Sequence, residues 1–149
     1  MKILKLLASL IFATFSVTVS AEEAVNPTEM TVYRSASCGC CGKWIAHAEQ
    51  NQFKINSVIS DDMQALKEKY GVPEKLASCH TAIVAGYVIE GHVPAEDIKK
   101  LLETKPNIIG IAAPGMPLGS PGMEMSGQKD AYKVMSFAMD GKFGVFAEH

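Results

Sequence analysis

The spacing of apolar residues between positions 30 and 59 predicts a strand, a helix and a second strand. Residues 30–34 alternate between apolar and polar side chains and are rich in β-formers. A helix is predicted next, with Ser37 as its N-cap and its end near Gln50. The buried face of that helix is expected to comprise Cys41, Trp44, Ile45 and Ala48, which recur at helical spacing. Residues 53–59 alternate again and are predicted to form the second strand.

The pattern between residues 60 and 106 predicts four more elements. They are a helix from about residue 61 to residue 70, an antiparallel pair of short strands over 81–84 and 87–89, and a helix between Pro94 and Pro106. The complete order is βαβαββα, which is the element order of the thioredoxin fold. The predicted fold class is therefore α/β and thioredoxin-like.

The C-terminal segment changes in composition. Residues 110–125 are rich in Pro, Gly and Met, so they are predicted to form no regular element and to lie over the domain as a loop. Residues 132–139 and 142–146 are predicted to form a β-hairpin around Asp140-Gly141, with Met135 and Met139 in the core. We therefore expect one thioredoxin-like domain over residues 30–149, with an added loop and hairpin.

The first 21 residues have the organisation of a secretory signal peptide. Lys2 and Lys5 precede an apolar run from Leu6 to Val19, and the small residues at 19–21 form a cleavage site. The run is short for a membrane span, so cleavage and export to the periplasm are expected, with no membrane span in the mature chain. Residues 22–29 are predicted to be a flexible leader.

The charge balance argues against a nucleic-acid partner. The formal net charge of the whole chain is −2, and removing Lys2 and Lys5 with the signal peptide changes it to −4, because no acidic residue precedes Glu22. Binding to nucleic acid depends on basic side chains that neutralise phosphates. A mildly acidic chain is not expected to bind nucleic acid.

Cysteines are concentrated between the first predicted strand and helix. Cys38, Cys40 and Cys41 fall within one turn, and the fourth cysteine, Cys79, directly precedes His80. Structural disulfides alone are a poor explanation, because two bridges would have to leave from one turn while a single cysteine lies elsewhere. A helix N-terminus stabilises the thiolate, which is the form that binds metal and attacks disulfides. In the thioredoxin fold the loop before the third strand faces this position, so Cys79 and His80 are expected beside Cys38.

Other sulfur and nitrogen donors are weaker candidates. Thiolates and thioethers favour Cu(I), and three methionines of the Pro/Gly-rich loop are candidate additional ligands, namely Met116, Met123 and Met125. We interpret His47 as a surface residue and His92 as a structural residue at the other end of the predicted hairpin. The sequence does not place His149.

Four segments together resemble the exported CopG-type copper-resistance proteins. They are Tyr33–Trp44 with its C-x-C-C motif, Ser78–Ala82, Gly86–Pro94, and the Pro-Gly-Met segment from Pro114 to Glu124. The resemblance implies a thioredoxin-like fold, copper bound through the C-x-C-C cysteines, and a role in periplasmic copper tolerance beside other copper-handling proteins. By this match Cys38, Cys40, Cys41 and Cys79 carry over as ligands, with His80 and the loop methionines as further candidates.

Three functions are compatible with these residues. The first is a periplasmic protein that holds more than one Cu(I) ion in a thiolate cluster and interconverts Cu(I) and Cu(II). The second is a thiol–disulfide oxidoreductase in which Cys38 attacks and Cys41 resolves. The third is a [2Fe–2S] protein using all four cysteines, which fits poorly because export in the unfolded state excludes a preassembled cluster.

Overall fold

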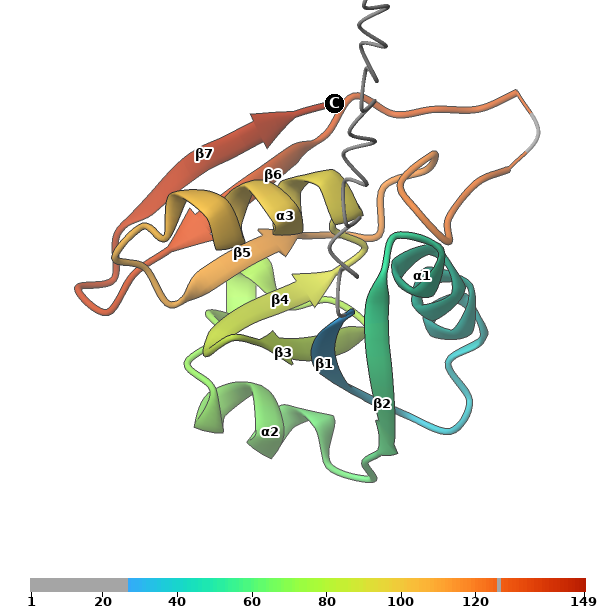
Figure 1. Cartoon of the computed structure of the whole chain (residues 1–149), viewed down its shortest axis with the longest axis horizontal. Helices are drawn as coiled ribbons and strands as arrows, with labels where there is room; N and C mark the ends of the chain where they lie inside the picture. The colour runs from blue at the N-terminus through green and yellow to red at the C-terminus, as the bar shows by residue number, and fades with distance from the viewer. Residues whose placement is uncertain (1–26, 126) are drawn as a thin grey trace, which may run out of the picture.

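A computed structural model describes residues 27–125 and 127–149 as a mixed α/β fold, with three α-helices around one seven-stranded sheet (Figure 1). In chain order the elements are β1 (Thr28–Arg34), α1 (Gly39–Gln50), β2 (Phe53–Ile59), α2 (Met63–Lys69), the short 3₁₀ helix η1 (Glu74–Leu76), β3 (His80–Val84), β4 (Tyr87–Gly91), α3 (Ala95–Thr104), β5 (Gly110–Ala113), β6 (Lys133–Phe137) and β7 (Phe143–Glu148). Apart from η1, which was not predicted, the order from β1 to α3 matches the prediction.

The strand order across the sheet is β2-β1-β3-β4-β5-β6-β7. Strand β1 runs parallel to β2 and antiparallel to β3, and β3 and β4 form an antiparallel hairpin. Strand β5 joins β4 in parallel, and the predicted C-terminal hairpin, β6 and β7, extends the sheet from β5. The sheet therefore brings the start of β3 beside the end of β4.

Helices cover both faces of this sheet. On one face, α1 and α3 bury an apolar cluster that includes Trp44, Ile98 and Leu101 against alternate residues of the central strands. On the other face, the segment from α2 to η1 packs Val72 and Leu76 against the strand residues whose side chains point toward α2. Figure 1 shows α3 and α2 on opposite sides of the central strands. Because side chains alternate along a strand, neighbouring residues of β3 and β4 face different helices.

Three local predictions were wrong. The helix N-cap is Cys38 rather than Ser37, so the cysteine motif itself starts α1. The segment after α3 begins with a strand, because β5 is fully buried between β4 and β6 and its backbone is paired on both sides. Met139 is 89% exposed and not part of the core, because it lies beyond the end of β6 at the hairpin turn.

The first strand begins slightly earlier than predicted. Strand β1 starts at Thr28, two residues before the predicted start, because Thr28 and Glu29 pair with Phe53 and Lys54 of β2. The predicted signal peptide lies outside the described residues. Among the helices that the structure describes, none is both long and apolar enough to span a membrane.

Candidate metal centre

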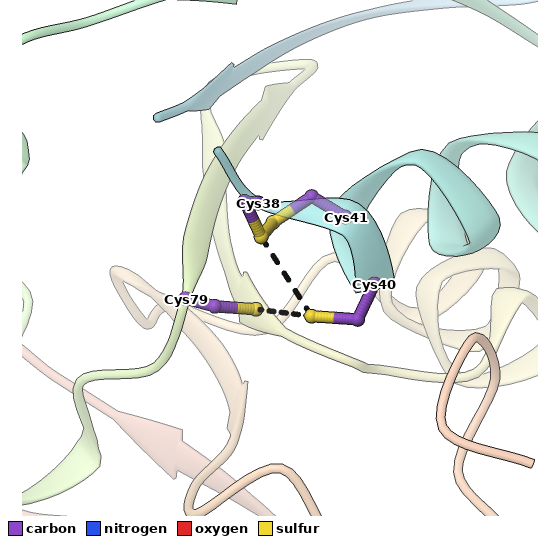
Figure 2. A group of neighbouring side chains, drawn as sticks. All are labelled: Cys38, Cys40, Cys41 and Cys79. Atoms are coloured by element: carbon purple, nitrogen blue, oxygen red, sulfur yellow. Dashed lines mark hydrogen bonds between the residues drawn. A yellow bond between two sulfur atoms is a disulfide. The ribbon is translucent and has the colours of Figure 1, made fainter. Parts of the chain in front are cut away.

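The C-x-C-C motif occupies the first turn of α1. Cys38 is the N-cap residue, and Cys40 and Cys41 are in the helix that begins at Gly39. Cys38 and Cys41 form a disulfide, with their Cα atoms 5.4 Å apart (Figure 2). Cys40 and Cys79 are free and half-buried. The spacing of the motif thus places one disulfide and one free thiol on the same helical turn.

Cys79 lies directly opposite this turn, as predicted from the sequence. Its Sγ is 3.9 Å from Cys40 Sγ, and Cys40 Sγ is 3.7 Å from Cys38 Sγ. Figure 2 shows Cys79 entering from the segment before β3 while the other cysteines come from α1. All four sulfur atoms lie within 4.8 Å of one another. We call these residues, Cys38, Cys40, Cys41 and Cys79, the sulfur group.

A second group of donors shares Cys79 with the first. Cys79 Sγ is 3.2 Å from His80 Nδ1 and 3.0 Å from His92 Nε2. Cys79, His80 and His92 have ligand atoms within 4.8 Å of one another, and we call them the histidine group. His80, which was predicted to lie beside the cysteine motif, is therefore present at the site, and its side chain is fully buried.

The interpretation of His92 as a structural residue away from the site was wrong. Strands β3 and β4 are antiparallel, and the register that pairs Val84 with Tyr87 continues to place Cys79 opposite His92. The sequence did contain this signal, because the tight turn at Gly86 fixes which residues face each other. Following that register from the turn to the open end of the hairpin would have placed His92 beside Cys79.

The loop carbonyl of Pro121 decides which nitrogen of His92 can bind a metal. His92 Nδ1 lies 2.8 Å from the Pro121 oxygen. A carbonyl oxygen only accepts hydrogen bonds, so Nδ1 carries the proton and Nε2 presents its lone pair to Cys79. A histidine ligand oriented by a hydrogen bond from its other ring nitrogen is the usual arrangement in metal sites.

Burial sets the protonation of the histidine group. It lowers the pKa of His92, and it lowers the pKa of His80 well below its usual value, so both imidazoles are neutral at neutral pH. It raises the pKa of Cys79 to about 12, with the neighbouring Cys40 adding to the rise. His80 Nε2 is buried without a hydrogen-bond partner in the described part of the chain. A cation bound here would displace the Cys79 proton and gain neutral nitrogen donors.

Cys79 is expected to react with iodoacetamide at a rate that still rises at a pH of about 10, where an ordinary thiol of pKa about 8.5 has levelled off. The reason is its raised pKa, because only the thiolate reacts. Peptide mass spectrometry of the folded, disulfide-intact protein would give the pH–rate profile. The same peptide in urea-unfolded protein is the control, and a plateau near the ordinary pKa in the folded protein would contradict the prediction.

The loop after β5 covers the motif, as predicted for the Pro/Gly/Met-rich segment beyond Ala113. Gly122 has a φ of +84°, and a Cβ there would lie 2.8 Å from Trp44 N and 3.1 Å from Cys40 O. Only glycine therefore allows the loop to contact the first turn of α1. Of the candidate methionines, Met123 follows this contact and is half-buried, whereas Met116 and Met125 are 41% and 59% exposed.

The two remaining histidines lie outside both groups. His47, predicted to be a surface residue, is half-buried, and its Nε2 accepts a hydrogen bond from Ala95 N at 3.1 Å. His149 stacks on Tyr132 and lies 2.7 Å from Asp97 Oδ2. The His47 hydrogen bond holds the N-terminus of α3. The contacts of His149 attach the end of β7 to Tyr132 and to α3.

Comparison with known proteins places the chain in a family. A solved structure named "Copper resistance protein copG- Form 2" is 47% identical, with a TM-score of 0.80, over 83% of this chain and 98% of that one. The chain belongs to the CopG family. A second solved structure, "Copper resistance protein copG- Form 1", matches at 48% identity and a TM-score of 0.79 over the same shares.

The family profile described as "Protein of unknown function, DUF411" matches residues 76–123. That span contains Cys79, both histidines of the histidine group and the first part of the loop that covers the motif, including Gly122. No curated protein matches the chain. The CopG family assignment therefore rests on the two solved structures, and the profile agrees with it.

Proposed function

We propose that this CopG family member is a periplasmic copper-tolerance protein that holds more than one Cu(I) ion in the sulfur group and interconverts Cu(I) and Cu(II). The observation that carries this proposal is the convergence of four cysteine sulfurs from α1 and from the start of β3. Thiolate sulfur is the donor that Cu(I) prefers. The names of the two solved relatives, copper resistance proteins, point to the same metal.

The two donor groups suit different chemical states of copper. The sulfur group offers soft ligands for Cu(I), whereas imidazole nitrogen also suits Cu(II). Cys79 belongs to both groups, so an ion could remain in contact with its sulfur while the other ligands change. Met116, Met123 and Met125 remain candidate thioether ligands on the covering loop. These features support a site that handles both oxidation states; oxidation of two Cu(I) ions to Cu(II) would release the two electrons that, with two protons, convert the Cys38–Cys41 disulfide to two thiols.

Export to the periplasm is part of the proposal. We assign residues 1–21 to a signal peptide, the residues from 22 to the start of β1 to a leader, and the residues from β1 onward to the thioredoxin-like domain. The Cys38–Cys41 disulfide is compatible with an oxidising compartment, where such bonds persist. The strand order β2-β1-β3-β4, with β3 antiparallel to β1, supports the thioredoxin-like assignment.

The disulfide also favours a second candidate function, thiol–disulfide exchange. Two electrons and two protons convert the Cys38–Cys41 disulfide to two thiols, and only the reduced form offers all four sulfurs to copper. An exchange enzyme would use Cys38 as the attacking thiol and Cys41 as the resolving one. The segment from Ala77 to Thr81 that faces the motif contains no proline but places Cys79 and His80 there. Metal donors at this position favour copper binding over exchange with a protein substrate.

Reduced protein handled without oxygen is expected to bind more than one Cu(I) per chain and to prefer Cu(I) to Zn(II). Titration against a Cu(I) chelator, with X-ray absorption to identify the ligands, measures both. Cys40→Ser is expected to lose bound copper, because it removes a sulfur between Cys38 and Cys79. An exchange enzyme acting through Cys38 and Cys41 does not need Cys40, so under the second candidate function its activity would survive the substitution.

Ser37→Ala is the matched control, since it changes a neighbouring side chain that contributes no sulfur. Preference for zinc in the wild-type protein would refute the copper proposal. Full copper binding by Cys40→Ser would refute the cluster, and exchange activity that persists in that variant would favour the second function.

A further inference from the structure

A buried ion pair lies on the face of the sheet opposite α1. Lys67 of α2 reaches Glu90 of β4, with Nζ 2.5 Å from Oε1, and the side chains are 9% and 0% exposed. Burying two charges carries a desolvation penalty that their attraction only partly offsets. A buried ion pair is therefore weak evidence that the pair stabilises the fold. The other hydrogen bonds of Lys67 and Glu90 indicate a further role.

Glu90 binds the two residues that flank Cys79-His80. Its Oε1 accepts a hydrogen bond from Ser78 N at 2.6 Å, and its Oε2 accepts one from Thr81 Oγ1 at 2.6 Å. Lys67 Nζ donates to the same Thr81 oxygen at 3.0 Å. One carboxylate thus holds the backbone before Cys79 and the side chain after His80.

Strand geometry transmits this hold to the metal donors. Thr81 pairs with Glu90 in the β3–β4 register, so both side chains face α2. His80 precedes Thr81 in β3, so its side chain faces α1. The centroids of the His80 and Trp44 rings are 4.5 Å apart. The hydrogen bonds to Glu90 hold Ser78 and Thr81 in place. Cys79 and His80, which lie between them in the chain, therefore have little freedom to move.

Gly91 shows how closely the two segments approach each other. It has a φ of +73°, and a Cβ there would lie 2.6 Å from Ser78 Cβ and 2.8 Å from Ala113 O. The segment before Cys79 therefore rests directly on the end of β4. Glu90 and Gly91 constrain it at adjacent positions.

We propose that Lys67 and Glu90 are positioning residues, which act through Ser78 and Thr81 to hold Cys79 and His80 in their metal-binding arrangement. The copper readout of this inference rests on the proposed function. The reactivity of the Cys79 thiol provides a second readout that does not.

The test replaces the pair by apolar residues of similar size, Lys67→Met with Glu90→Leu. Such replacements of buried ion pairs are often neutral or stabilising, so the variant separates positioning from stability. Cys79 is expected to react with iodoacetamide about tenfold faster, because the free energy of local opening falls when its supporting hydrogen bonds are lost. Copper bound per chain and the Cu(I)–thiolate absorption are expected to fall in the same variant.

Two further variants complete the design. Lys67→Met with Glu90→Gln retains an oxygen acceptor for Ser78 N and should recover part of the wild-type behaviour. Lys54→Met with Glu29→Leu removes an exposed ion pair of the same type between β1 and β2, and it should change neither readout.

A folded double variant carrying Lys67→Met and Glu90→Leu, with the wild-type alkylation rate and copper content, would overturn the proposal. If that variant does not fold, Thr81→Val decides, because it removes one hydroxyl and no charge. Faster Cys79 alkylation in Thr81→Val supports positioning, and an unchanged rate overturns it. If the wild-type protein binds no Cu(I), the proposed function fails, and the alkylation comparison still decides the role of the pair.

Discussion

Cys79→Ser is expected to lower copper binding more than any other single cysteine-to-serine substitution in this protein. Cys79 is the one residue common to the sulfur group and the histidine group. Its sulfur lies 3.9 Å from Cys40 Sγ and 3.0 Å from His92 Nε2, so its loss weakens both sets of ligands. A serine hydroxyl is a poor ligand for Cu(I).

The size of this effect has a lower bound. Losing a residue that only orients a ligand commonly costs about 10–100-fold in metal affinity, and losing a shared ligand should cost at least about 100-fold. Competition with a Cu(I) chelator measures the affinity, and elemental analysis measures the copper lost per chain. Urea unfolding of the same variant should give nearly the wild-type stability, because Cys79 is a half-buried residue at the end of a loop.

His92→Ala is the informative companion to Cys79→Ser. It removes one of the two nitrogen donors of the histidine group while leaving His80 and all four sulfurs in place. Copper binding that falls in Cys79→Ser but not in His92→Ala would show that His92 is not a copper ligand. Wild-type copper content in Cys79→Ser would contradict the shared site and leave Cys38, Cys40 and Cys41 as the ligands.

Trp44→Ala is expected to destabilise the fold by about 3–5 kcal/mol, the range for removing a large aromatic side chain from a core. Trp44 is fully buried on α1, donates a hydrogen bond from Nε1 to Val93 O at 2.9 Å, and contacts the His80 ring. Single domains have total stabilities of about 5–15 kcal/mol, so this loss is a large share of the whole. The site should suffer as well, because Trp44 supports both α1 and His80.

Chemical unfolding followed by far-UV circular dichroism measures this prediction, since Trp44 is the sole tryptophan and its fluorescence is lost in the variant. Lys43→Ala, at an exposed position of the same helix, is the control and should change stability by no more than about 0.5 kcal/mol. A loss below about 1 kcal/mol in Trp44→Ala would mean that the space left by the indole is filled by rearrangement.

The sequence by itself determined most of the element order and the location of the cysteine motif. Apolar spacing is a local property, so the strands around the motif and the buried face of α1 could be read without knowing any tertiary contact. The placement of Cys79 opposite the motif was also predicted, although it is 39 residues from Cys40. That step depended on comparing the element order with a known fold, and not on local spacing.

Only the tertiary structure decided how the remaining residues of the site are oriented and paired. The hairpin register in the sequence could have placed His92 beside Cys79, but its ring is oriented by Pro121, which lies 29 residues further along the chain. The pairing of Cys38 with Cys41 was likewise open, because three neighbouring thiols allow several pairings and geometry selects among them.

The segment after α3 and the Lys67–Glu90 pair show why such features are hidden in the sequence. Gly110–Ala113 lacks the length and the alternation of a typical strand, and it becomes one because β4 and β6 supply backbone partners on both sides. Lysine on a helix usually faces solvent, yet Lys67 is buried because its side chain pairs with Glu90 of β4. Both outcomes depend on partners that are distant in the chain, and a local pattern holds no information about a partner's position in space.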